Sequence, residues 1–145
     1  MKLLIDADGC PVTEIALEEA RARGIEALLF CDTAHIINRE DALTIVVAKG
    51  ADSADFALVN HACSGDVVVT QDYGLAAMCL SKRCIPIRQD GLIYDANNID
   101  SLLMARHTAR KIRRGGGRLK GPKKRTDAED EAFLRALRSV LDQRL

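Results

Sequence analysis

Tryptophan is absent from the 145-residue sequence, and there are only three phenylalanines and two tyrosines. With aromatic residues at 3% of the chain, a row of aromatic side chains for base stacking is not indicated. No apolar run approaches the roughly 20 residues that span a bilayer. Asp6 and Asp8 interrupt the first apolar stretch, which does not fit a signal peptide. We therefore expect a cytoplasmic protein that does not associate with membranes.

The cysteines also lack a functional pattern. There are five of them, an odd number, and none form a C-x-x-C pair. This argues against a zinc knuckle or a secreted disulfide scaffold and for reduced, mostly buried thiols. The length fits one domain, and a hydrophobic content of 48% is enough to bury an ordinary core without disulfides.

Net charge is zero, but the charges are unevenly distributed along the chain. Residues 1–105 hold 8 Lys/Arg and 16 Asp/Glu, whereas residues 106–125 hold 10 Lys/Arg and no acid. An acidic body joined to a basic segment is typical of a protein that holds a polyanion near a metal-binding pocket. The alternative is that the basic segment is a solvated tail.

Short apolar runs alternate with helical patterns along the first two thirds of the chain. Strands are expected at 2–8, 27–30, 43–47, 66–70 and 84–87. Helices are expected from Pro11 to Gly24, over 52–62, over 75–80, over about 98–113, and from Thr126 or Asp127 onward. The alternation predicts βαβ units and a parallel sheet. Three consecutive valines at 67–69 suit a central strand that is covered on both faces, and Pro86 suggests a sheet edge.

Acidic residues fall where these strands end or where the next helix opens. Asp6 and Asp8 terminate the first strand, Asp52 and Asp55 open a helix, and Asp72 follows the valine strand. In a parallel sheet, ligands bind beyond the carboxyl ends of the strands, where these side chains can converge. Gathered carboxylates repel one another unless a divalent ion neutralises them. The sequence therefore predicts a Mg²⁺ or Mn²⁺ site suited to phosphodiester cleavage.

Most of these acids also have a structural interpretation. Asp52 fits a helix N-cap with Asp55 in the first turn, Asp8 fits an Asp-Gly turn, and Asp72 fits a cap of the next helix. Asp6 is the hardest to dismiss, because a carboxylate at the end of a buried strand is costly unless it is paired or metal-bound.

The Asp6-x-Asp8 pattern also matches the opening of the haloacid-dehalogenase phosphatases, where the first Asp is a nucleophile and the second a general acid. Thr70 would then serve as their second motif. That family needs a later Lys and a further acidic pair, whereas Asp52 and Asp55 precede Thr70. A small-molecule phosphatase is therefore the weaker alternative.

Four segments together resemble the bacterial YaiI/YqxD family, and the likeness covers nearly the whole chain. They are Asp6-Ala-Asp-Gly-Cys-Pro-Val12, Gly50-Ala-Asp-Ser-Ala-Asp-Phe56, Thr70-Gln-Asp-Tyr-Gly-Leu-Ala76 and Gly115-Gly-Gly-Arg-Leu-Lys-Gly-Pro-Lys-Lys-Arg-Thr126. That family is similar to PIN-like domains, which are metal-dependent ribonucleases. The resemblance implies a PIN-like three-layer α/β sandwich with a central, mostly parallel sheet and a Mg²⁺ or Mn²⁺ site. It assigns Asp6, Asp52 or Asp55, and Asp72 with Thr70 to that site.

The C-terminal part is expected to form a basic, Gly-rich arm and a helix over 113–145, in one structural unit with the PIN-like domain over 1–112. The cations of this arm, and those near the end of the helix before it, suit a phosphate backbone and give affinity without sequence specificity. The predicted nucleic-acid-binding residues are Arg106, Arg110, Lys111, Arg113, Arg114, Arg118, Lys120, Lys123, Lys124 and Arg125. The alternative is that the arm packs on the acidic body or on a second subunit.

The sequence therefore favours a divalent-metal-dependent nuclease, with RNA favoured over DNA as substrate. Asp6, Asp8, Asp72 and Thr70 are the predicted catalytic residues, and Asp6, Asp8, Asp52, Asp55 and Asp72 the predicted metal ligands. A protein that binds nucleic acid without turnover, in a regulatory role, is the alternative of a different class.

Overall fold

A computed structural model of the chain describes residues 1–32, 43–47, 53–116 and 124–144. The strands are β1 (Lys2–Asp6), β2 (Glu26–Asp32), β3 (Leu43–Val47), β4 (Val67–Val69) and β5 (Ile85–Ile87). The helices are α1 (Thr13–Ala22), α2 (Ser53–His61), α3 (Tyr73–Ser81), α4 (Ala96–Arg114) and α5 (Asp127–Arg144). The helix expected from Pro11 begins two residues later, because Val12 occupies its N-cap position.

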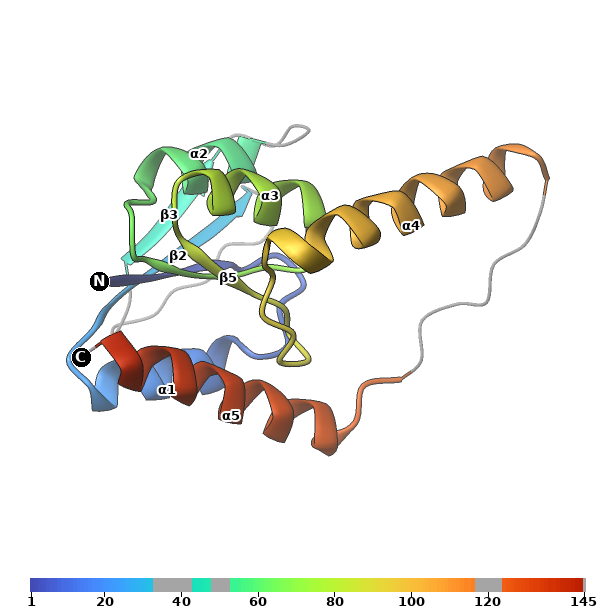
Figure 1. Cartoon of the computed structure of the whole chain (residues 1–145). Coiled ribbons are helices and arrows are strands. Elements are labelled where there is room, and N and C mark those ends of the chain that lie inside the picture. Colours follow the sequence, from blue (N-terminus) through green and yellow to red (C-terminus); the bar gives the residue numbers. More distant parts are fainter. Residues whose placement is uncertain (33–42, 48–52, 117–123, 145) are drawn as a thin grey trace.

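The strands form one sheet in the order β3-β2-β1-β4-β5, and every neighbouring pair is parallel. The predicted parallel sheet is therefore confirmed, and β5 with its Pro86 lies at an edge as expected. Helices cover both faces, so that the chain forms a three-layer α/β sandwich (Figure 1). Helices α1 and α5 lie on one face, and α2 and α3 lie on the other (Figure 1).

The side-chain alternation of the strands divides the core between these two faces. Leu3 and Ile5 of β1 pack in the cluster formed with α1 and α5, whereas Leu4 packs in the cluster formed with α2 and α3. The valine strand divides in the same way, with Val68 on the α2/α3 face. Both faces of the central strands are thus buried, which explains their continuous apolar sequence.

Helix α4 departs from this layered body. Its first turns pack on α3 through Ile99, Leu102 and Leu103, and a capping box formed by Asp95 and Asn98 fixes its start. Beyond Leu103 the side chains of the helix are exposed, apart from a half-buried alanine. Figure 1 shows the helix projecting away from the sheet.

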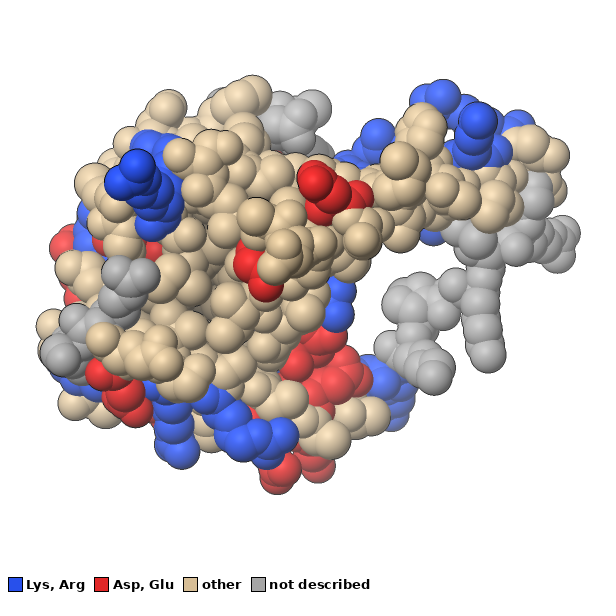
Figure 2. Space-filling model, viewed as in Figure 1, with Lys and Arg blue, Asp and Glu red and all other residues tan. Residues whose placement is uncertain are grey.

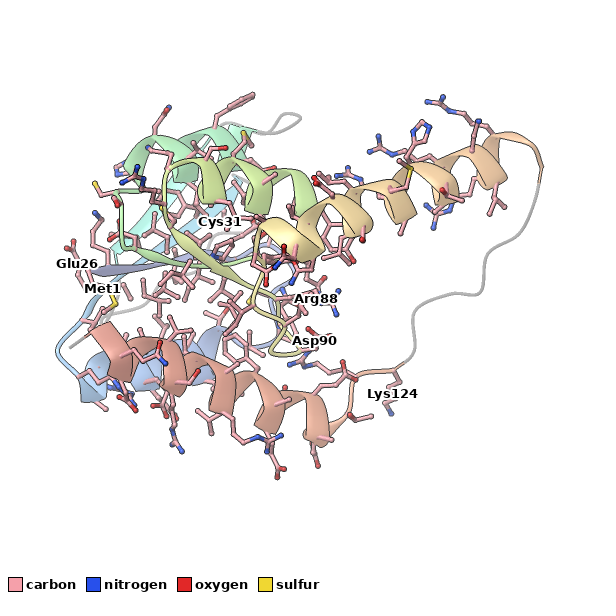
Figure 3. The ribbon with its side chains drawn as sticks, in the orientation of Figure 1. Met1, Glu26, Cys31, Arg88, Asp90 and Lys124 are labelled. Atoms are coloured by element: carbon pink, nitrogen blue, oxygen red, sulfur yellow. The ribbon has the colours of Figure 1, made fainter. Side chains whose placement is uncertain are left out.

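The two ends of the sheet can be distinguished in Figure 3. Met1 and Glu26, at the starts of β1 and β2, lie at one end, and Arg88 and Asp90, just beyond β5, lie at the other. The starting end is closed by Asp66, whose buried carboxylate accepts the backbone N–H of Lys2 at 2.8 Å and pairs with its ammonium at 3.0 Å. The carboxyl end, from which α4 projects, carries the candidate site.

Candidate functional site

The strand order reverses between β1 and β4. In doubly wound sheets, a ligand-binding crevice lies beyond the carboxyl ends of the strands at such a reversal. Asp6 is the last residue of β1, and Thr70 directly follows β4. The Thr70 hydroxyl donates a hydrogen bond across this point to Asp6 Oδ2, at 2.9 Å. The first predicted acid is thereby held where doubly wound sheets bind their ligands.

The direction of these two side chains follows from the strand alternation. Leu4 and Val68 face α2 and α3, and Asp6 and Thr70 come two residues later on their strands. Both therefore point to the α2/α3 side of the sheet. Thr70 is fully buried, and the Tyr94 hydroxyl donates to its backbone carbonyl at 3.2 Å. Thr70 is therefore a buried residue that positions the Asp6 carboxylate.

Asp72 is tied to the same hydroxyl. Its backbone N–H donates to Thr70 Oγ1 at 3.0 Å. Its carboxylate Oδ1 accepts the backbone N–H groups of Gly74 at 2.8 Å and Leu75 at 3.1 Å, so that it caps α3. The structural interpretation of Asp72 as a helix cap is thus confirmed, and the same carboxylate also lies 3.6 Å from Arg106 Nη1.

The acids of the crevice influence one another electrostatically. The pKa of Asp6 is raised from its ordinary 3.8 to about 6, mainly because burial removes the carboxylate from water. The hydrogen bond from Thr70 opposes this shift, whereas the negative charges of Asp72 and Asp8 add to it. The charges of Asp8 and Asp72 are therefore near enough to act on Asp6.

Asp8 lies in the turn that leaves β1. The turn is closed by the Cys10 N–H, which donates to the Ala7 carbonyl at 3.2 Å. Gly9 has φ of +67°, a left-handed conformation that favours glycine. The predicted Asp-Gly turn is therefore present, and it keeps Asp8 half-buried beside the crevice.

Asp55 reaches the site from the first turn of α2. It lines a pocket with a volume of about 350 Å³. The other walls include Asp72 at the N-cap of α3, Met78 from α3, Phe56 from α2 and Arg106 from α4. Asp72 thus belongs both to the strand-end crevice and to this pocket. Asp52 lies outside the described residues.

The donor set can be compared with the needs of a metal ion. Within the described ranges, no three His, Cys, Asp or Glu side chains gather closely enough to form a protein-only metal cage. Mg²⁺ does not need such a cage, because it is commonly held by one or two carboxylates together with water and substrate phosphate. Asp6 with one neighbouring carboxylate would be enough for a site of that second kind.

The predicted phosphate-binding residues fall into three groups. Those on α4 are exposed: Arg106, Arg110, Lys111, Arg113 and Arg114. Figure 2 shows Lys and Arg gathered over the outer part of this helix. Arg118, Lys120 and Lys123 lie outside the described residues. Lys124 is exposed, whereas Arg125 donates to Asp130 Oδ1 at 2.7 Å and to the Gln89 carbonyl at 2.6 Å, which ties it to the protein.

Two features of the site were not predicted from the sequence. Phe56 was not assigned to any predicted site, and it is 59% exposed at the pocket wall. The exposure of Phe56 could not be predicted from the sequence, because α2 has apolar residues on several sides and its buried face is therefore not defined. Arg106 was predicted only as a phosphate ligand, and its pairing with Asp72 depends on where α4 crosses α3.

The fold and site together define a three-layer α/β protein with acidic side chains at its topological switch point. A model of a family described as uncharacterised, YaiI/YqxD, matches residues 4–143, and the chain belongs to that family. It is 49% identical over 144 residues to a UPF0178 protein of Exiguobacterium sibiricum, covering 99% of both chains. It is 47% identical over 143 residues to a UPF0178 protein of Clostridium acetobutylicum, covering 97% of both. No solved structure was found to match.

Proposed function

We propose that this protein is a divalent-metal-dependent nuclease that hydrolyses phosphodiester bonds, with RNA as the favoured substrate. One observation carries the proposal: Asp6 is held by Thr70 at the switch point of the sheet, within electrostatic reach of Asp8 and Asp72. A costly ionisable group placed in a crevice is typical of functional sites. The preference for RNA rests on the resemblance to PIN-like domains.

Asp6 would hold the ion together with Asp8 or Asp72, and Asp52 or Asp55 would assist from α2. When bound, Mg²⁺ or Mn²⁺ would lower the pKa of water and stabilise charge on the phosphate oxygens. Phosphate and water would complete the coordination, which is why two or three carboxylates suffice.

The chain's own groups would position the reaction. Thr70 fixes one oxygen of Asp6 through its hydroxyl, which leaves Asp6 Oδ1 for the crevice. The helix cap holds Asp72 in a single orientation. The exposed cations of α4 would retain the phosphate backbone beside the crevice, since their positive charges attract a polyanion of any sequence.

The same cations favour a second candidate function, binding of nucleic acid without turnover. That alternative needs only the charged surface of α4 and gives the carboxylates no chemical role. The two candidates therefore differ in the expected effect of removing Asp6.

The test is cleavage of a generic labelled RNA with Mn²⁺ by the wild type, Asp6→Asn and Asp127→Asn. Asparagine keeps the size of Asp6 and an acceptor for Thr70, so that folding is preserved. Asp127 is an exposed acid in the first turn of α5 and provides the matched control. We expect Asp6→Asn to lose at least about 100-fold in rate and Asp127→Asn to behave as the wild type.

Equal cleavage by the wild type and Asp6→Asn would rule out this site as the source of activity. RNA that is bound but left intact by all three proteins would support the binding function instead. Cleavage of phosphomonoesters in place of RNA, lost in Asp6→Asn, would support the phosphatase alternative.

A further inference from the structure

Phe56 differs from the other aromatic residues of the chain. Phe30 and Phe133 are fully buried, Tyr94 is 1% exposed, and Tyr73 is half-buried in contact with Tyr94. The side chain of Phe56 is 59% exposed. A single exposed aromatic is common on protein surfaces, but this one forms part of the wall of a pocket.

The pocket lies beside the acidic crevice and has both apolar and charged walls. Phe56 of α2 and Leu75 and Met78 of α3 give it apolar surface, and Asp55 and Arg106 supply charges of opposite sign. Its volume of about 350 Å³ is in the range of small-molecule sites. It can therefore hold a flat organic group with a few polar atoms.

Gly74 keeps the polar side of this pocket open. A Cβ atom at this position would lie 3.2 Å from Asp72 Oδ1 and 3.8 Å from Arg106 Nη1. A side chain would therefore occupy the space where the pocket meets Asp72. Because Gly74 has no side chain, the pocket stays open to the Asp72 carboxylate.

We propose that this pocket binds one unpaired nucleobase of a single-stranded nucleic acid, next to the phosphodiester at the acidic crevice. The substrate class rests on the proposed function. The base stacks on Phe56, because every base presents a π-face to an aromatic ring. The Asp55 carboxylate accepts a hydrogen bond from a base amino group, and Arg106 attracts the adjoining phosphate.

This occupant follows from the chemistry of the walls. An aromatic face, a carboxylate acceptor and a guanidinium complement the three parts of a nucleotide: the ring, its amino group and the phosphate. In a duplex the base is already stacked and paired, so reaching the pocket would require unpairing it. The subsite therefore favours single strands over duplexes, which the cations of α4 alone would not do.

The absence of tryptophan allows a direct test. Phe56→Trp places a single indole in the pocket, and its fluorescence is titrated in EDTA with a short single strand, an abasic strand of the same length, and a duplex. We expect strong quenching by the base-bearing single strand and little by the other two. Ser139→Trp, an exposed position on α5 in the opposite helix layer, is the control and should show no quenching.

Dissociation constants measured in EDTA give the second readout. Phe56→Ala should weaken binding of the base-bearing single strand by about tenfold, and binding of the abasic strand by less than about twofold. Phe56→Tyr, which keeps the ring, should bind as the wild type. Equal losses for both strands, or no loss in Phe56→Ala, would overturn the proposal. So would equal quenching of the indole by abasic and base-bearing strands.

These binding measurements do not depend on cleavage. Base-dependent binding through Phe56 without Mn²⁺-dependent cleavage would contradict the nuclease proposal alone. Cleavage that depends on Asp6, combined with unchanged binding in Phe56→Ala, would contradict the nucleobase subsite alone.

Discussion

The proposed role of Asp6 requires its carboxylate to be ionised, and this ionised form destabilises the folded protein. Burial raises the pKa of Asp6 to about 6, and the hydrogen bond from Thr70 only partly offsets this effect. By comparison, the buried Asp66 at the opposite end of the sheet is paired with Lys2 at 3.0 Å. A partly buried carboxylate with no cationic partner in the described part of the chain, such as Asp6, is typical of a functional site, whereas the paired carboxylate of Asp66 is typical of a structural one.

This difference predicts an unusual dependence of stability on pH. With its pKa at about 6, folded Asp6 keeps a proton that the unfolded chain has already lost above its ordinary pKa of 3.8. The free energy of unfolding should therefore fall as pH rises from about 4 through about 6. The shift corresponds to roughly 3 kcal/mol, at about 1.36 kcal/mol for each pKa unit.

Asp6→Asn removes this titration. Urea denaturation in EDTA should find Asp6→Asn more stable than the wild type by about 1–3 kcal/mol near neutral pH, with a smaller difference below about pH 4. Other acids titrate in both proteins and cancel in the comparison. A mutant that is less stable than the wild type by the same amount at every pH would contradict the account.

Several residues of the site could be predicted from the sequence, because their positions follow from strand ends. Asp6, Thr70 and Asp72 each sit at or just beyond a strand, and parallel strands bring such positions together. Phe56 and the pairing of Arg106 could not be predicted in the same way. They depend on how helices rotate and cross, which apolar periodicity does not specify when a short helix is apolar on several sides.

At the scale of elements, the loop after β5 links the edge of the sheet to helix α5. Ile87 and Ile93 form an antiparallel bridge across this loop, and Arg88 and Asp90 pair at 2.7 Å within it. Its Gly91, with φ of +96°, lies directly against α5, where a Cβ atom would be 2.6 Å from the backbone oxygen of Ala132. The contact holds α5 against the end of the sheet that carries the site.

Gly91→Ala should therefore destabilise the protein strongly. The substitution adds left-handed backbone strain, of about 1–3 kcal/mol, to a clash with backbone atoms that cannot rotate away. Thermal or urea unfolding should show a loss of more than about 3 kcal/mol. Gly24→Ala is the matched control, because Gly24 has φ of +66° and nothing within 4 Å of its Cβ position.

The control should lose only about 1–2 kcal/mol, the cost of the left-handed conformation alone. If the two variants lose equal stability, the close approach of the loop to α5 has no energetic weight. The close approach of this loop to α5 could not be predicted from the sequence. In a sequence, a glycine packed against another backbone, such as Gly91, cannot be told from a glycine in an open turn, such as Gly24.

At the scale of the whole molecule, the sandwich itself was the most predictable feature. The run Val67–Val69 and the alternation of strands and helices indicated a parallel sheet, and continuous apolar strands need cover on both faces. The projection of α4 was not predictable, because the sequence does not show that only Ile99, Leu102 and Leu103 pack on α3 while Met104 and Ile112 stay exposed. That projection carries the exposed cations of its outer part out from the body of the protein (Figure 2). In the described part of the chain, no helix is long and apolar enough to cross a membrane.

The outer cations of α4 should determine the salt dependence of RNA binding. For single strands, the slope of log affinity against log salt changes by about 0.7 for each phosphate contact. Replacing Arg110 and Arg113 with Gln should reduce the slope by up to about 1.4 and weaken binding to all sequences alike. Arg135→Gln, on the exposed side of α5, should leave the slope unchanged. An unchanged slope in the α4 variant would instead support the arm packing on protein.

The most direct test of the central claim is a crystal structure of the protein soaked in Mn²⁺, with the ion located by anomalous scattering. The account predicts a peak within about 2.0–2.3 Å of an Asp6 oxygen and of an oxygen from Asp8 or Asp72, absent in Asp6→Asn. A peak elsewhere on the protein with none at Asp6, or the same peak in Asp6→Asn, would contradict the assignment of this crevice as a metal site.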